Sequence, residues 1–198
     1  MMLKSILLAA VLAALTAPAM ALPIVSGDGT ETCTGNNGGD CVTIAPHPAW
    51  QPNGAGQWIS YTDTGVGGFV APNSTPSPLF TVTETFTTAY RSMLTLLVFA
   101  DDTAQVFLDS TALNAPNFTQ GTCAIGQLGC EPGEGATFAF EVAAGTHTLE
   151  FDVYQVGGAT TGVMYEGEVN AIPVPAAGGM ALAGIAGLAL VARRKRHA

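Results

Sequence analysis

Three aspartates near the middle of the chain have the residue type and spacing of a metal site. Asp101 and Asp102 follow an apolar run, residues 93–100, and Asp109 follows the next segment. We expect the three residues to flank one hairpin, which would bring their carboxylates together. Hard oxygen ligands from such loops suit calcium. The sequence therefore predicts a calcium site at these aspartates, although no EF-hand spacing is present.

Side chains for nucleophilic or acid–base catalysis are few. Between the two ends of the chain the only histidines are His47 and His147, and no G-x-S-x-G or H-E-x-x-H motif occurs. His147 alternates with threonines at a strand start, which predicts that it faces solvent. Glu150 and Asp152 share one strand face, as glycosidase carboxylates must, but exposed faces of acidic proteins carry such pairs routinely. We predict that the protein is not an enzyme.

Aromatic side chains on a loop or a sheet face would be needed to contact a carbohydrate. Trp50 lies in the Pro-rich stretch PHPAWQPNG and is the candidate for such contact. Trp58 alternates with Ile59 and Tyr61 in a strand-like pattern, so we expect its indole in the core. Tyr61 and Tyr90 are further candidates for carbohydrate contact.

The four cysteines form two pairs that are close in the sequence, each with glycine in its spacer. We predict the disulfides Cys33–Cys41 and Cys123–Cys130, because local pairing is favoured among the three possible connectivities. A zinc site is the alternative, but the C-x2-C spacing typical of zinc sites is absent. The cysteines are therefore interpreted as structural.

The elements that must position these residues have a period of two rather than 3.6. No segment between the two ends of the chain has a helical stripe, and Gly and Pro separate the strand-like segments. These segments are QWISYT, FTVTETFT, MLTLLVFA, AQVFLDS, ATFAFEV, THTLEFDVYQ and GVMYEGEV. A short hairpin is expected at residues 143–146. The pattern predicts an all-β fold, a single antiparallel β-sandwich or jelly roll.

The segment from Leu22 to Ala171 has the size of one domain and a strongly acidic composition. All 15 Asp and Glu residues lie between Asp28 and Glu168, and Arg91 is the only Lys or Arg in the segment, which gives a net charge of −14. Such a surface repels polyanions. The composition therefore excludes nucleic acid as a partner.

Two stretches resemble galactose-binding-like jelly rolls of secreted bacterial proteins. They are LLVFADDTAQVFLDSTAL and AAGTHTLEFDVYQVGGATTGVMYEGEV. The matching residues are Ala100, Asp101, Asp102, Val106, Leu108, Asp109, Gly145, His147, Leu149, Gly157 and Gly158. Ser110 departs from the pattern, where the family commonly has glycine. The resemblance implies the fold more than it implies a function.

The N-terminal residues 1–21 have the three parts of a secretory signal peptide. Lys4 is followed by an apolar run and by the small-x-small sequence Ala19-Met20-Ala21. We predict cleavage after Ala21, so that the mature chain begins near Leu22 and is exported.

The C-terminal residues 172–198 join an uncharged stretch to a basic cluster. The cluster consists of Arg193, Arg194, Lys195 and Arg196. As a helix, the preceding 21 uncharged residues would be about 31 Å long, close to the hydrocarbon thickness of a bilayer. The basic cluster would keep this end in the cytoplasm and the acidic domain outside. We predict one transmembrane helix, and a permanent single-span anchor is one interpretation of it.

This C-terminal arrangement resembles the PEP-CTERM class of sorting signals, and most closely the variant with the motif Val-Pro-Leu-Pro-Ala. The corresponding residues are Ile172, Pro173, Val174, Pro175 and Ala176. The resemblance implies a Gram-negative bacterial envelope protein that is held transiently in the inner membrane. It also implies an exosortase-type processing enzyme as partner, with the cell surface or the extracellular matrix as destination.

These features favour an exported, surface-sorted and non-enzymatic protein associated with exopolysaccharide. The alternative is a carbohydrate-binding module supported by calcium, and an envelope hydrolase is a more distant one.

Overall fold

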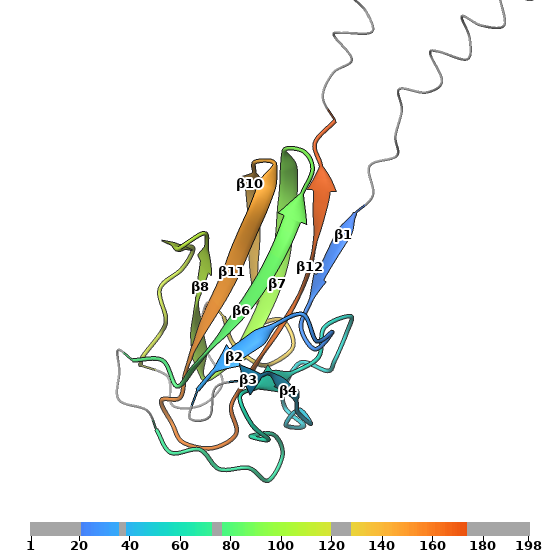
Figure 1. Cartoon of the computed structure of the whole chain (residues 1–198). Helices are drawn as coiled ribbons and strands as arrows, with labels where there is room; N and C mark the ends of the chain where they lie inside the picture. The colour runs from blue at the N-terminus through green and yellow to red at the C-terminus, as the bar shows by residue number, and fades with distance from the viewer. Residues whose placement is uncertain (1–20, 36–38, 73–76, 120–127, 174–198) are drawn as a thin grey trace, which may run out of the picture.

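The computed structural model describes residues 21–35, 39–72, 77–119 and 128–173 (Figure 1). The predicted signal peptide, apart from Ala21, lies outside these ranges, and so does the predicted sorting signal beyond Pro173. Within the described ranges no helix is long and apolar enough to cross a membrane. Export and sorting therefore stay predictions.

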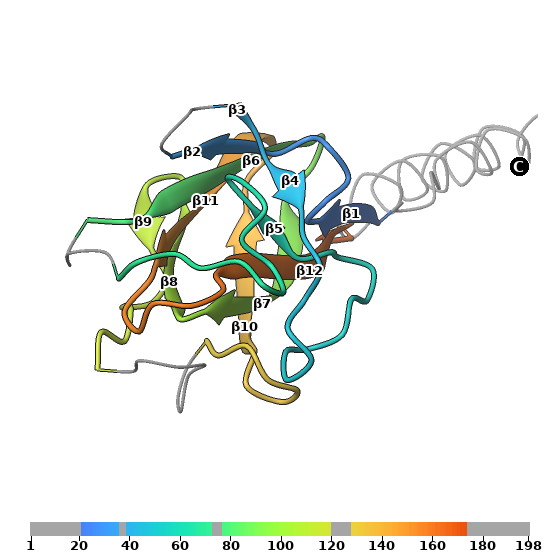
Figure 2. The same ribbon diagram turned by 90° about the horizontal axis from the view of Figure 1, so that it is seen from below.

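The described residues form two antiparallel sheets that pack as two layers (Figure 2). Sheet A has the order β10-β7-β12-β5-β4, with β1 also paired to β12, and sheet B has the order β3-β2-β6-β11-β8-β9. The strands of sheet A are β1 (Leu22–Val25), β4 (Val42–Thr43), β5 (Ile59–Ser60), β7 (Ser92–Asp101), β10 (Ala136–Val142) and β12 (Gly162–Ala171). The strands of sheet B are β2 (Thr32–Thr34), β3 (Gly39–Asp40), β6 (Phe80–Thr88), β8 (Thr103–Leu108), β9 (Thr111–Ala112) and β11 (Gly145–Tyr154).

The chain crosses between the sheets at the connections β1–β2, β3–β4, β5–β6, β6–β7, β7–β8, β9–β10, β10–β11 and β11–β12. Such crossings between two antiparallel sheets make the fold a jelly-roll β-sandwich. The predicted all-β fold class is confirmed.

The hairpin predicted at residues 143–146 is wrong. β10 pairs with β7, whereas β11 pairs with β6 and β8 in the opposite sheet. The short link is therefore an arch between the layers. Alternating apolar residues show which face of a strand is buried, but both a hairpin and an arch satisfy that pattern.

Alternate side chains of the long strands fill the space between the layers. From β6 and β11 they include Phe80, Val82, Phe86, Leu149, Phe151 and Val153. A second cluster covers the outer face of sheet A, where Trp50 and Trp58 belong to one group with Phe99 and Met164. Trp58 is fully buried, as predicted.

The two ends of the sandwich differ (Figure 1). The terminal end contains Leu22, the turn 89–91, the link 143–144 and Ala171. The loop end contains the connections 61–72 and 155–161, joined by backbone hydrogen bonds from Val70 to Ala159 and from Thr161 to Thr64. Both chain ends of the domain therefore leave from the side opposite these loops.

Candidate functional site

Three carboxylates meet where β1 turns into β2, beside the middle of β6. Asp28, Glu31 and Glu84 each offer an oxygen within 4.8 Å of the others. We call this group the carboxylate cluster. Asp28 is exposed, whereas Glu31 and Glu84 are buried. Within the described ranges these are the residues whose number and spacing fit a metal ion.

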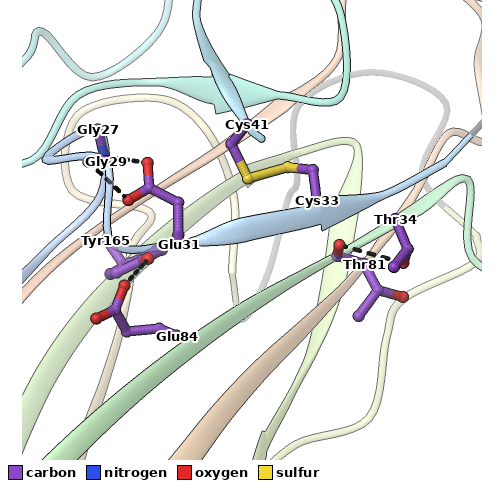
Figure 3. Close-up of a disulfide and its surroundings, with 9 residues drawn as sticks. All are labelled: Gly27, Gly29, Glu31, Cys33, Thr34, Cys41, Thr81, Glu84 and Tyr165. Atoms are coloured by element: carbon purple, nitrogen blue, oxygen red, sulfur yellow. Dashed lines mark hydrogen bonds between the residues drawn. A yellow bond between two sulfur atoms is a disulfide. The ribbon is translucent and has the colours of Figure 1, made fainter. Parts of the chain in front are cut away.

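Glu84 points into the sandwich from the inner face of β6. It occupies the buried position between Val82 and Phe86 in the alternating pattern and is 4% exposed. The Tyr165 hydroxyl donates to its Oε2 at 3.1 Å (Figure 3). Burial raises the pKa of Glu84 above its usual value, and hydrogen bonds from Thr30 and Tyr165 oppose the rise.

The turn after β1 holds the other two carboxylates. Glu31 accepts the backbone N–H groups of Gly27 and Gly29 at 2.9 and 3.1 Å (Figure 3). Both glycines have positive φ, 84° and 86°, which favours glycine at these positions. Burial opposes ionisation of Asp28, but hydrogen bonds from Thr30 hold its pKa below the usual value.

The cluster has more acceptors than donors. The single hydroxyl proton of Thr30 faces Asp28 Oδ1 at 2.6 Å and the two Glu84 oxygens at 2.9 and 3.1 Å. In the described part of the chain Arg91 is the only Lys or Arg, and it is paired with Glu141. A divalent cation or a proton on Glu84 would relieve the repulsion between these carboxylates.

The predicted disulfide Cys33–Cys41 is confirmed and lies close to the cluster (Figure 3). It connects β2 to the residue after β3, with a Cα–Cα distance of 4.9 Å. Cys130 is buried and is not a free thiol. Its predicted partner, Cys123, lies outside the described residues.

The structure does not bring the three predicted calcium ligands together. Asp101 and Asp102 lie at the loop end, whereas Asp109 follows β8 at the terminal end. A strand of six residues is about 20 Å long, so β8 separates the pair from the third carboxylate. The calcium-site prediction failed for the same reason as the prediction of a hairpin at residues 143–146. Both assumed that consecutive strands pair, whereas β7 and β8 belong to different sheets.

Asp101 and Asp102 form a buried carboxyl pair. Asp102 Oδ2 accepts the backbone N–H groups of Val156 and Gly157 at 2.6 and 2.7 Å. Burial, and then the hydrogen bond and charge of Asp102, raise the pKa of Asp101 to about 8. The pair therefore fastens the 155–161 connection to the end of β7, with Asp101 in its protonated form at neutral pH.

His147 is buried, so the prediction that it faces solvent is wrong. Its Nδ1 lies 2.7 Å from Asp109 Oδ2, and its Nε2 lies 3.0 Å from the Ala143 carbonyl oxygen. Both neighbours are acceptors, and a protonated imidazole satisfies both. The hydrogen bond to Asp109 raises the pKa of His147. The pair ties the arch between β10 and β11 to the turn after β8.

Glu150 and Asp152 do share one face, the outer face of sheet B. The Thr81 hydroxyl donates to Asp152 at 2.5 Å. Burial and the neighbouring Asp152 raise the pKa of Glu150.

Trp50 is not available to a ligand, in contrast to the prediction. Its side chain is 3% exposed, and its ring centroid lies 4.3 Å from that of Trp58. The Pro-rich stretch folds back over the outer face of sheet A, where the Gln51 N–H donates to the Cys130 carbonyl at 2.6 Å. Both tryptophans therefore belong to the core.

Phe69 and Tyr90 are the exposed aromatic residues in the described ranges, with 75% and 62% of their surface accessible. Tyr90 lies in the β6–β7 turn at the terminal end. Phe69 borders a depression of about 450 Å³ at the loop end, which also contains Tyr61 and Asp63. We call this the 61–72 depression. Two other hollows of similar size lack an exposed aromatic side chain.

No protein-family model matches the chain, and no curated protein matches it. Among solved structures it is similar to a family 35 carbohydrate-binding module from Clostridium thermocellum, with 5% identity, a TM-score of 0.41, and coverage of 76% of this chain and 99% of that one. It is also similar to a family 35 carbohydrate-binding module from an environmental isolate. The identity is 9% and the TM-score 0.38, with coverage of 78% of this chain and 99% of that one. For the Podospora anserina GH26-CBM35 β-(1,4)-mannanase the identity is 11% and the TM-score 0.42, with coverage of 80% of this chain and 29% of that one.

Proposed function

We propose that the protein is an exported, non-catalytic carbohydrate-binding module, and that its ligand is a polysaccharide of the cell surface or extracellular matrix. The observation that carries this proposal is Phe69, a large aromatic side chain that is 75% exposed beside a polar depression. The fold does not need this ring in its core. An exposed ring of this kind contributes to binding when a partner covers it.

The chemistry of the 61–72 depression suits a sugar ring. The Phe69 ring offers an apolar face against which the C–H face of a pyranose can pack. Tyr61 lies beside it, held by contact with Phe80 at a centroid distance of 5.3 Å. The carboxylate of Asp63 and the hydroxyl of Thr62 supply acceptors and a donor for sugar hydroxyl groups.

Calcium has a supporting role in this proposal. The carboxylate cluster joins the turn after β1 to β6 and lies away from the 61–72 depression, so a cation there would stabilise the sandwich rather than contact the sugar. The Cys33–Cys41 disulfide fixes the same region and suits the oxidising compartment to which the predicted signal peptide leads. Sorting through residues 172–198 by an exosortase-type enzyme completes the proposal.

The test is affinity electrophoresis of the exported protein through gels that contain candidate polysaccharides. We expect retardation by at least one polysaccharide and a loss of about tenfold or more in affinity for Phe69→Ala. Tyr90→Ala is the matched control, because it removes an exposed aromatic at the opposite end of the sandwich. Equal retardation of both variants and of the unchanged protein would show that the depression is not the binding site.

A further inference from the structure

β10 is a long edge strand whose outer side has no partner among the described residues. It pairs with β7 through all seven of its residues. The other edge strands are shorter: β1 has four residues, and β3, β4 and β9 have two each. A long edge presents a row of backbone N–H and C=O groups that can pair with a further strand.

The neighbouring edge in sheet B is closed by a side chain. Beyond the short β9, Asn114 accepts the Val106 N–H at 2.7 Å and donates to the Ala104 carbonyl at 2.8 Å. This amide takes the place of a further strand beside β8. Among the described residues no side chain caps the outer side of β10 in this way. The edge at β8 is therefore capped, whereas the adjacent edge at β10 is open to pairing.

The sequence of β10 is complementary to itself when two copies run antiparallel. With Ala139 opposite Ala139 of a second copy, Phe138 faces Phe140 and Thr137 faces Glu141. Phe138 and Phe140 are half-buried and near each other, with ring centroids 6.5 Å apart. Pairing would therefore gather four aromatic rings on one face, and aromatic cross-strand pairs stabilise sheets.

Charge also favours this strand as the contact between two copies. The domain carries 15 acidic residues and one Arg, so most of its surface repels a second copy. The only charged residue of β10 is Glu141, and Arg91 donates to it through Nε at 2.9 Å. The only Lys or Arg of residues 22–171 thus neutralises the single charge of the edge strand.

We propose that two copies of the chain associate through antiparallel pairing of their β10 strands. The two A sheets then form one continuous sheet about a two-fold axis at Ala139. Because the strands run in opposite directions, the loop ends of the two copies point in opposite directions. The pair can therefore present two ligand sites on opposite sides, whatever the ligand is.

A cysteine placed on the two-fold axis tests this arrangement. Residues directly opposite each other in antiparallel strands have Cα atoms about 4.5–5.5 Å apart, within the range of a disulfide. Ala139 is exposed, so Ala139→Cys in the full chain should give a covalent dimer on a non-reducing gel. Thr137→Cys is the control, since two copies of this residue would lie about 13 Å apart.

Failure of Ala139→Cys to cross-link, or equal cross-linking of Thr137→Cys, would overturn the proposal. A second pair of variants needs no thiol. Ala139→Lys places like charges face to face and should abolish the dimer in analytical ultracentrifugation, whereas Ala139→Ser should retain it. Equal association of these two variants would also overturn the proposal.

Discussion

Glu84 is a buried carboxylate on the inner face of β6 and belongs to the carboxylate cluster. It replaces an apolar residue in the alternating pattern of β6 and lies near two further carboxylates. The only Lys or Arg among the described residues, Arg91, is paired with Glu141. Burial raises the pKa of Glu84. Without a cation, its unfavourable ionisation costs stability as the pH rises above the ordinary value of 4.5.

We predict that calcium stabilises the protein at pH 7 and that Glu84→Gln removes this effect. A cation at about 100 times its Kd adds about 2.7 kcal/mol, or several degrees in Tm for a domain of this size. Calorimetry with calcium or with EDTA measures the shift. Glu168→Gln, on an exposed part of β12, is the control. A calcium shift that survives in Glu84→Gln would rule out the cluster.

The hydrogen-bonded pair of His147 and Asp109 should contribute more to the free energy of unfolding at low pH than at high pH. The folded pKa of His147 lies above the ordinary 6.5. The stabilisation is therefore complete below pH 6.5 and is lost as the pH rises through the folded pKa. We predict that His147→Gln destabilises the protein more at pH 5.5 than at pH 8.5, as measured by urea unfolding. An equal loss at both pH values would contradict the protonated pair.

The positions of the long strands could be predicted from the sequence, but the strands with which they pair could not. The segments FTVTETFT and THTLEFDVYQ became β6 and β11, because alternation reports directly which face is buried. The pattern contains no information about which layer a strand joins. The calcium prediction at Asp101, Asp102 and Asp109 failed for this reason, since it assumed a hairpin where the chain changes layers.

Two residues of the candidate sites, Glu84 and Phe69, were not predicted from the sequence. Glu84 is the one charged residue at an inward position of β6, where the alternating pattern calls for an apolar residue. That break in the alternation could have identified it from the sequence. Phe69 stands alone in the Gly-rich stretch TGVGGFVAP, without neighbours that would place it in a strand. Trp50 was wrongly predicted to be available to a ligand, because the prolines around it suggested an exposed loop. The loop instead folds over the outer face of sheet A, and the indole is buried.

The turn between β8 and β9 has a residue that its backbone geometry disfavours. Asp109 and Ser110 both have positive φ, 49° and 65°, as type I′ turns require, and glycine is preferred at such positions. We predict that Ser110→Gly stabilises the protein by up to about 1 kcal/mol. Thr111→Gly, in β9 itself, should destabilise it instead. Denaturant unfolding distinguishes these results, and a loss of stability in Ser110→Gly would contradict the prediction.

The raised pKa values of Glu84, Asp101 and His147 all change the stability of the domain in the same direction with pH. Each makes folding less favourable as the pH rises, and Asp101 does so up to about pH 8. The lowered pKa values of Asp28 and Asp109 act oppositely, but only as the pH falls through 3.8 and below.

We therefore predict greater stability near pH 5 than near pH 8, as measured by Tm across this range. Asp101→Asn keeps a donor towards Asp102 without an ionisable group, so it should reduce the loss on the alkaline side. A Tm that is unchanged or higher at pH 8 would contradict the sign of these shifts.

The first strand of the domain pairs with the last. β1 contacts β12 from Leu22↔Val169 to Val25↔Glu166, and β12 is also the partner of β7. At the usual speed of a ribosome, on the order of ten seconds separate the synthesis of these two strands. Until β12 has been made, β1 has no partner strand and the edge of β7 that β12 later pairs with stays open. Sheet A can be completed only after residues 162–171 have been made, and a holding chaperone would have most effect before that point.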